Sequence, residues 1–236
     1  MTELLNIQDL TYKLNLNSIL DGVTCTVAAG KIVGLLGING AGKTTLMRLI
    51  SGVAKGYGGQ ITIAGQANAA QRKQQVSFSH QLDGNNDRAR LSQIVQDYQA
   101  LYPDFDNDQF QQLAEFLKLD QQKRLGQLSK GNRKKFIIAM TLARQVPLYL
   151  LDEPFDGIDG MSRKTIIASI LQWKPDTATI LISDHHVDDI ANLLDSVIVL
   201  KDKQVAATEQ ADTIRAQGQS IEDYYENIYT GGTKND

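Results

Sequence analysis

GINGAGKT, at residues 37–44, is the stretch that decides how this chain folds. A strand-like run, KIVGLL at residues 31–36, precedes it, and a helix-like run, TLMRLI at residues 45–50, follows it. A glycine-rich turn between a buried strand and a helix is the setting in which the pattern GxxxxGK(S/T) predicts a phosphate-binding loop. We favour that interpretation over a glycine-rich turn that only joins a strand to a helix.

The residues of this loop suit a nucleoside triphosphate. Glycines at positions 37, 40 and 42 let the backbone curl so that successive N–H groups point inward, where the helix N-terminus adds positive potential. Lys43 supplies a cation for the β- and γ-phosphates, and the Thr44 hydroxyl can ligate Mg²⁺. The residues that we expect to contact the nucleotide here are Gly37, Asn39, Gly40, Ala41, Gly42, Lys43, Thr44 and Thr45.

The composition is that of one compact domain in a reducing compartment. The chain has 236 residues, of which 42% are hydrophobic, enough for a proper core. Its net charge of −3 argues against a nucleic-acid partner, and the short basic clusters at residues 72–73 and 133–135 are expected to be solvated helix faces. The single cysteine, Cys25, is expected to be a packed, inert thiol. Because no apolar stretch approaches the ~20 residues that span a bilayer and no signal-peptide pattern is present, we expect a cytosolic chain unless a partner holds it at a membrane.

Periodicity predicts a mixed α/β fold: a P-loop NTPase core with a parallel sheet, an N-terminal antiparallel β-subdomain and an inserted, mostly helical subdomain. The first thirty residues alternate in the manner of antiparallel strands, and buried parallel strands are expected at 148–151, 179–183 and 196–200. We predict a single domain over residues 1–236, divided into a nucleotide-binding core (1–82 and 146–218), a helical subdomain (83–145) and a C-terminal helix and tail (219–236).

Cap and break signals mark the helices of the second half. Ser92 can cap a helix that Pro103 ends, and Asp106 or Asn107 begins the next one. Near the end of the chain, Ser220 opens a Ser-x-x-Asp start before a helical apolar spacing. We therefore expect at least these three helices.

PLYLLDE, at residues 147–153, is an apolar strand that ends in two adjacent acids. Carboxylates at the end of a buried strand are costly unless a cation or a proton transfer requires them. Asp152 suits a place near Mg²⁺, and Glu153 suits polarising the water that attacks the γ-phosphate. The alternative is a strand end with two solvated acids, which the phosphate loop makes the weaker interpretation.

LSKGN, at residues 128–132, stands ahead of that acidic strand and opens a helical run. With it, the chain resembles the nucleotide-binding subunit of an ATP-binding-cassette (ABC) transporter, in which an LSGGQ-type signature takes this place. Gln81 stands at the family's Q-loop, residues 155–159 at its D-loop and His185 at its switch histidine. The match covers nearly the whole chain in the family's motif order. The lysine of the signature and the tail, SIEDYY at residues 220–225, are similar to exporters of the ABC-2 type.

The resemblance implies an ATPase that uses ATP and Mg²⁺ and energises transport through a separate integral-membrane permease. Two nucleotide-binding subunits would close head to tail, with each ATP lying between one chain's phosphate loop and the other chain's signature. A homodimer is favoured because every matched catalytic position is intact, and it would lie at the inner face of the cell membrane. The sequence does not identify the transported substrate or the permease.

The resemblance also implies roles for single residues. Ser129 and Gly131 of the signature and Asp159 of the D-loop would contact the ATP held by the other subunit, helped by a helix N-terminus. His185 would bond the γ-phosphate, and Gln81 would touch the metal. The catalytic residues implied are Glu153, His185 and Gln81, and the metal ligands are Thr44, Gln81 and Asp152.

Some positions depart from the family pattern. Lys130 takes the place of a signature glycine, and Phe155 lies in a D-loop that usually carries small residues. The adenine-stacking aromatic of the family falls at Leu14, so Tyr12, two residues earlier on the same strand face, is the candidate for stacking, with weak stacking as the alternative. His80 stands where proline is common and is expected to be packed or at the surface rather than a ligand.

Two other functions use the same phosphate loop. A soluble ABC-type ATPase of ribosomes or chromosomes would carry two cassettes or long coiled coils, but residues 83–127 show no sustained heptads. A small-molecule kinase or GTPase has no reason to carry LSKGN, and no guanine-reading Asn-Lys-x-Asp is present. We therefore predict a transporter subunit, an exporter by its signature, with a soluble ABC-type ATPase as the alternative.

Overall fold

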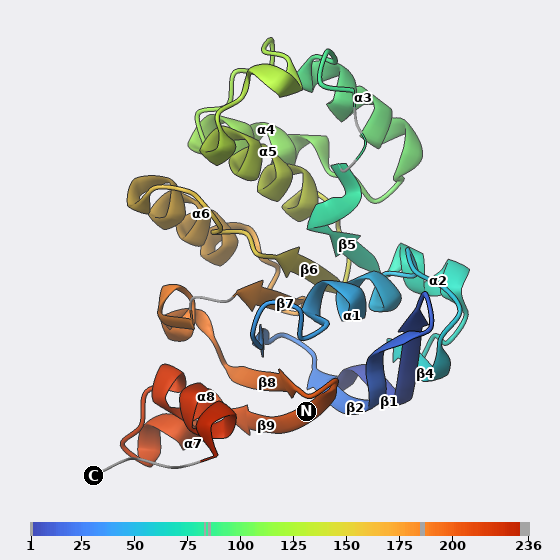
Figure 1. Ribbon diagram of the computed structural model, residues 1–236. Helices are drawn as coiled ribbons and strands as arrows, with labels where there is room; N and C mark the ends of the chain where they lie inside the picture. Colours follow the sequence, from blue (N-terminus) through green and yellow to red (C-terminus); the bar gives the residue numbers. More distant parts are fainter. Residues whose placement is uncertain (1, 83, 85, 185–186, 232–236) are drawn as a thin grey trace.

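Two β-sheets and the helices packed around them make up the chain (Figure 1). The computed structural model describes residues 2–82, 84, 86–184 and 187–231, apart from the side chains of residues 81, 82 and 189. A mostly parallel sheet, an antiparallel N-terminal sheet and a helical part between two strands of the larger sheet confirm the predicted fold class.

The larger sheet contains β3 (Ile32–Leu36), β5 (Val76–Phe78), β6 (Leu148–Asp152), β7 (Thr179–Asp184), β8 (Ser196–Lys201) and β9 (Gln204–Gln210). Their order is β5-β6-β7-β3-β8-β9, in which only β9 runs antiparallel to its neighbour. Every residue of β3, β6 and β7 is buried, because helices or the second sheet cover both faces of these strands. Because β3, β6 and β7 run parallel, their carboxyl ends meet at one edge of the sheet. The phosphate loop follows β3 and the two acids stand at the end of β6, so they lie at this edge.

The smaller sheet is antiparallel, with the order β2-β1-β4, and contains β1 (Glu3–Leu14), β2 (Asn17–Ala28) and β4 (Gly58–Ile63). Alternate residues of β2 are buried, as expected for strands with one face on a core. Cys25 is one of the buried residues and pairs across the sheet with Ile7. Burial raises the pKa of its thiol to about 12, which agrees with the predicted inert, packed cysteine.

Helix α1 (Lys43–Ile50) follows the phosphate loop and lies between the two sheets (Figure 1). Its residues Leu46, Met47, Leu49 and Ile50 are buried in one hydrophobic cluster with residues from both sheets. The helix that begins at the phosphate loop is therefore fixed in place by apolar contacts on two sides.

Arg72 overturns one expectation from the sequence. It was expected on a solvated helix face, but its side chain on α2 (Ala69–Gln74) is fully buried. The guanidinium donates to the carbonyl oxygens of Leu49 and Ile50, both at 3.2 Å, and to the Tyr57 hydroxyl at 2.7 Å. These carbonyls belong to the last turn of α1 and lack partners within the helix. Leu49 O also accepts from the Gly52 N–H at 3.1 Å just past the helix, and the buried guanidinium adds a bond to each carbonyl.

The helical part lies at the β5 end of the larger sheet and contains α3 (Leu91–Leu101), α4 (Asn107–Phe116) and α5 (Lys130–Leu142) (Figure 1). Together with α6 (Gly160–Trp173), these helices pack into a second hydrophobic cluster. Asp106 caps α4 by accepting from the Gln109 N–H at 2.9 Å. This confirms Asp106, one of the two residues predicted to begin this helix. The predicted cap at Ser92 is wrong, because α3 begins at Leu91 and its N-cap residue, Arg90, makes no side-chain cap hydrogen bond.

The chain ends in α7 (Ala211–Ala216) and α8 (Ile221–Thr230), which lie beside β8 and β9 (Figure 1). Ser220 caps α8 through a capping box with Asp223, which confirms the predicted start of this helix. Four short 3₁₀ turns complete the described elements: η1 (Ser79–Leu82), η2 (Leu125–Gln127), η3 (Val187–Asp189) and η4 (Ala191–Leu193).

Candidate nucleotide-binding site

The phosphate loop joins the end of β3 to α1, as the sequence predicts. Gly40 and Gly42 have φ angles of 84° and 103°, a left-handed region that glycine adopts without strain. A side chain at Gly42 would also collide with Leu20 of β2, because a Cβ there would lie 2.8 Å from Leu20 Cδ2. The loop borders a cavity of about 280 Å³ that is lined by Ile19, Asn39, Gly40, Gly42, Lys43, Thr44, Thr45 and Glu153.

Lys43 begins α1 and turns its ammonium group back onto the loop. Its Nζ donates to the carbonyl oxygen of Gly37 at 2.6 Å and to that of Ile38 at 3.2 Å. Burial lowers the pKa of Lys43, while three nearby carboxylates act in the opposite direction. Those carboxylates belong to Glu153, Asp152 and Asp184.

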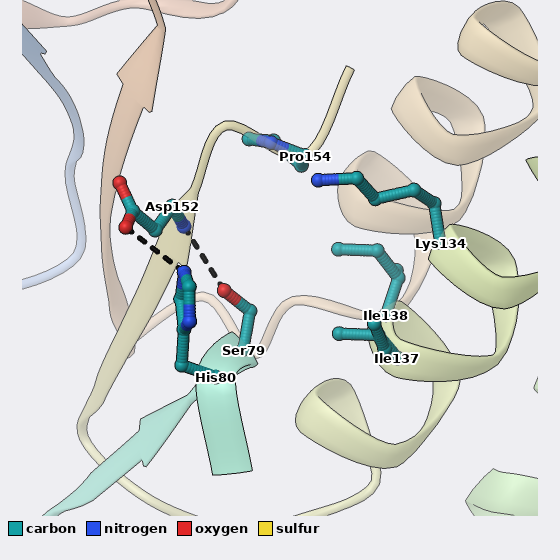
Figure 2. Close-up of a pocket in the computed structure, with 7 residues that line it drawn as sticks. All are labelled: Ser79, His80, Lys134, Ile137, Ile138, Asp152 and Pro154. Carbon is teal, nitrogen blue, oxygen red and sulfur yellow. Dashed lines mark hydrogen bonds and ion pairs between the residues drawn. The ribbon is translucent and has the colours of Figure 1, made fainter. Parts of the chain in front are cut away.

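The two acids of the sequence motif lie at the end of β6, beside the end of β7. Asp152 is buried, and its Oδ1 accepts from Ser183 Oγ at 2.5 Å. Its Oδ2 lies 3.0 Å from His80 Nε2 (Figure 2). Burial by itself raises the pKa of Asp152, but hydrogen bonds from His80, Ser183 and Thr44 outweigh it and hold this pKa below its ordinary value. The carboxylate is therefore kept ionised close to Thr44.

Glu153 has an unusual backbone. Its φ of 45° is rare for a residue with a side chain, and such conformations gather at functional sites. The Glu153 N–H donates to both the carbonyl oxygen and the Oγ of Ser183, at 3.0 and 3.1 Å. Its own carbonyl oxygen accepts from Lys134 Nζ at 2.5 Å. These bonds fix the peptide planes on both sides of Glu153, whose side chain lines the cavity at the phosphate loop.

Lys134 comes from α5, the helix that begins within the signature. Figure 2 shows it with Ile137 and Ile138 on one side of a cavity of about 90 Å³, opposite Ser79, His80 and Asp152. Burial among these residues lowers the pKa of the Lys134 ammonium. One turn earlier on the same helix, Lys130 Nζ lies 3.0 Å from Asp156 Oδ2. Two lysines of the signature helix thus hold the segment that follows the acidic strand.

The residues near the loop fit Mg²⁺. No group of three or more His, Cys, Asp or Glu side chains arranged to hold a metal occurs among the described residues. Mg²⁺ does not need such a cage, since it is commonly held by one or two carboxylates, water and the phosphates of a nucleotide. The ionised Asp152 and the neighbouring Thr44 hydroxyl are oxygen ligands of the required kind.

The signature and the D-loop lie next to each other within the chain. Ser129 is the N-cap of α5, and its Oγ accepts from the Asn132 N–H at 3.2 Å. Asp159 caps α6 by accepting hydrogen bonds from the first amides of that helix. These hydrogen bonds lower the pKa of the Asp159 carboxyl, and those from Ser162 have the largest effect. A Cβ at Gly131 would lie 3.1 Å from Ser162 Oγ, so glycine allows the two helix starts to approach.

Other predicted residues are placed as follows. His185 lies outside the described residues, and of Gln81 only the backbone, in η1, is described. Tyr12 is half-buried against the core of the smaller sheet, whereas Ile19 is the residue of this β1–β2 hairpin that lines the cavity. The stacking role of Tyr12 therefore stays a prediction.

Sequence reasoning missed the residues that orient the acids. Ser183 and His80 hold Asp152, while Lys134 holds Glu153. The expectation that His80 is a packed or surface residue is incomplete: its ring lies 5.1 Å from that of Phe78, but its Nε2 faces Asp152. The only signal in the sequence for Ser183 is its place at the end of a parallel strand.

The comparisons with known proteins agree with this site. The sequence profile of the family described as ABC transporter matches residues 20–156, more than half of the chain. This chain belongs to the ABC transporter family. As an ABC ATP-binding subunit it binds ATP and is an ATPase, and such subunits work with membrane permease components. Among the described residues, no helix is both long and apolar enough to cross a membrane.

Individual ABC proteins resemble the chain over most of its length. The ABC transporter ATP-binding protein YtrB of Bacillus subtilis (strain 168) is 28% identical, over 91% of this chain and 74% of YtrB. The tungstate uptake system ATP-binding protein TupC of Peptoclostridium acidaminophilum is 30% identical, over 82% of this chain and 92% of TupC. A solved structure described as the ATP binding subunit of an ABC transporter has a TM-score of 0.85 at 26% identity, covering 96% of this chain and 99% of the other.

Proposed function

We propose that this ABC subunit powers export, with two copies closing head to tail on two ATP molecules while bound to a separate membrane permease. The observation that carries the proposal is the grouping of Lys43 with Asp152 and Glu153 at the phosphate loop. Export rather than uptake is supported by Lys130 in the signature and by the SIEDYY tail. Uptake is the alternative to test, since TupC is named for an uptake system.

The chemistry assigned to the site is ATP hydrolysis. The loop amides and Lys43 would bind the β- and γ-phosphates, and Asp152 with Thr44 would hold Mg²⁺, which neutralises phosphate charge. Glu153 would orient a water and take its proton as the water oxygen attacks the γ-phosphorus. The bond from that phosphorus to the bridging oxygen breaks, so ADP leaves with the electron pair and inorganic phosphate forms.

The second copy would complete the site. Ser129, at the N-terminus of α5, and Gly131 suit the γ-phosphate of the ATP bound by the partner copy, because a helix N-terminus favours an anion. Asp159, His185 and Gln81 keep the roles that the family resemblance gives them. A homodimer is supported by the presence of every matched position in this one sequence.

Closure would depend on the nucleotide and be passed to the permease. ATP between the two copies favours the closed pair, and hydrolysis removes the phosphate that both copies hold. The helical part, residues 83–145, would carry the motion from the Gln81 region to the permease. The chain would therefore work at the inner face of the cell membrane.

Reconstitution tests this proposal. The chain should co-purify from membranes with a multi-span protein, and that protein in lipid vesicles should raise its ATPase rate several-fold. A Lys43→Ala variant should lose both basal and stimulated hydrolysis. When ATP is supplied on the side of the membrane that carries the chain, substrate should move to the opposite side. Movement of substrate toward the ATP side would contradict export. An ATPase rate that the permease leaves unchanged would contradict coupling.

A further inference from the structure

Helix α8 reaches the phosphate loop, although the proposed function assigns no role to this contact. Tyr229 lies in its last turn, close to the carboxyl end of β8. The Ile38 N–H donates to the Tyr229 hydroxyl at 3.2 Å, and the same hydroxyl donates to the carbonyl oxygen of Leu200. A residue 191 positions away in sequence therefore bonds the backbone of the phosphate loop.

This hydroxyl bridges the two strands just past their last pair. The ladder between β3 and β8 ends with Leu36 opposite Val199. Leu200 follows Val199 within β8, and Ile38 lies two residues past Leu36, in the phosphate loop. Tyr229 thus supplies an acceptor to the Ile38 N–H and a donor to the Leu200 carbonyl oxygen just past the last pair of these two strands.

The peptide unit between Gly37 and Ile38 is held at both ends. Its N–H belongs to Ile38 and bonds Tyr229, while its carbonyl oxygen belongs to Gly37 and accepts from Lys43 at 2.6 Å. Because a peptide is planar, its N–H and C=O turn together. A bond that fixes the N–H also fixes the direction of the carbonyl that Lys43 uses.

Other contacts keep Tyr229 in place. Lys201 Nζ donates to the carbonyl oxygens of Ile228 and Tyr229, at 2.9 and 3.3 Å, where the end of a helix favours a cation. The Tyr225 ring packs 4.9 Å from that of Tyr229. Burial raises the pKa of Tyr229, so its hydroxyl keeps the proton that it donates to Leu200.

We propose that Tyr229 is a positioning residue for nucleotide binding, whose hydroxyl holds the Gly37–Ile38 peptide in the orientation that the phosphate loop requires. This inference rests on the proposed function, because the loop must bind ATP for its shape to matter. A Cβ at Gly37 would lie 2.9 Å from the Leu200 oxygen and 3.4 Å from the Tyr229 hydroxyl, so this close approach also requires glycine.

The test compares Tyr229→Phe with Tyr225→Phe in the full-length chain. Phenylalanine keeps the ring but leaves Ile38 N–H and Leu200 O without the hydroxyl, whereas Tyr225 makes no hydroxyl hydrogen bond within the described part of the chain. Equilibrium titration with Mg-ATP should show a dissociation constant about 5- to 30-fold higher for Tyr229→Phe, and within about twofold of the unmodified protein for Tyr225→Phe. Turnover at saturating ATP should fall less than about threefold in both variants.

Two results would overturn the inference while leaving ATP binding intact: an unchanged affinity in Tyr229→Phe, or an equal loss in both variants, which would assign the effect to helix packing. If the unmodified protein binds no ATP, the proposed function fails and this inference fails with it. Hydrogen exchange gives a second measurement that does not depend on the variant folding. The Ile38 amide should exchange slowly in the unmodified protein, and unprotected exchange there would contradict the hydrogen bond to Tyr229.

Discussion

At the scale of single residues, the site depends on how backbone and side chains orient two acids. Asp152 stays ionised in a buried place because Ser183, His80 and Thr44 offer it hydrogen bonds. Glu153 keeps its rare backbone conformation because Ser183 holds its N–H and Lys134 holds its carbonyl oxygen. The chemistry of the two acids is thus set by neighbours from distant parts of the chain.

Replacing Glu153 by glutamine should separate binding from turnover. The amide keeps the shape of the side chain but cannot take a proton, so we expect the ATP hydrolysis rate to fall about 10²- to 10⁴-fold. ATP affinity should stay within about threefold of the unmodified protein in an equilibrium titration. A variant that still hydrolyses ATP at a near-normal rate would assign the proton transfer to another residue.

Replacing Lys134 by methionine should slow turnover without weakening ATP binding. The variant loses the 2.5 Å bond to the Glu153 carbonyl oxygen, so the strained peptide is less well held. We expect the catalytic rate to fall about 10- to 150-fold, which corresponds to the loss of one hydrogen bond to a charged group, about 1.5–3 kcal/mol. Lys135→Met, at the next position of α5, is the matched control, and an equal loss in both variants would show that general charge on this helix is responsible.

At the scale of elements, helix ends carry much of the structure and the proposed function. Arg72 donates to the last two carbonyls of α1, and Ser129, Asp159 and Ser220 cap the starts of α5, α6 and α8. The caps of α4 and α8 could be predicted because Asp106 and Ser220 stand beside the helices that they cap. Arg72 was misassigned because its partners lie 22 and 23 positions away, so its burial left no local signal.

Replacing Arg72 by methionine should lower stability. The buried carbonyls of Leu49 and Ile50 and the Tyr57 hydroxyl would lose a partner, at a cost of about 2–3 kcal/mol. For a domain of this size the melting temperature should fall by about 4–12 °C in a thermal unfolding scan. The exposed neighbour Lys73, changed to methionine, should shift it by less than about 2 °C. A similar shift in both variants would argue against the structural role of Arg72.

A substitution at the start of α5 tests the trans contact. Ser129→Arg brings a long side chain to the point where the partner's γ-phosphate is expected, so two copies should no longer close on ATP. Binding of ATP to the variant's own phosphate loop should be unchanged, while cooperative ATP hydrolysis should fall at least about tenfold. Gln96→Arg adds the same charge on an exposed position of α3 as a control. Normal ATP-dependent association of the Ser129 variant would contradict the head-to-tail arrangement.

At the scale of the whole molecule, most of the architecture could be predicted from the sequence. The continuous apolar runs of β3, β6 and β7, which are buried on both faces, made a parallel sheet predictable. The alternation of buried and exposed residues in β2 made the antiparallel sheet predictable. Contacts between distant segments could not be predicted, because no sequence period records them. Those of Ser183 with Asp152, and of Tyr229 with Ile38, are examples.

The most direct test of the central claim is the molar mass of the Glu153→Gln protein with and without Mg-ATP, measured by light scattering after gel filtration. If ATP is sealed between two copies of the chain, slow hydrolysis should trap the pair. We predict the monomer mass, 26.0 kDa, without nucleotide and about twice that mass with Mg-ATP. Ser129→Arg added to Glu153→Gln should restore the monomer. A Glu153→Gln protein that binds ATP tightly yet stays monomeric would contradict the account.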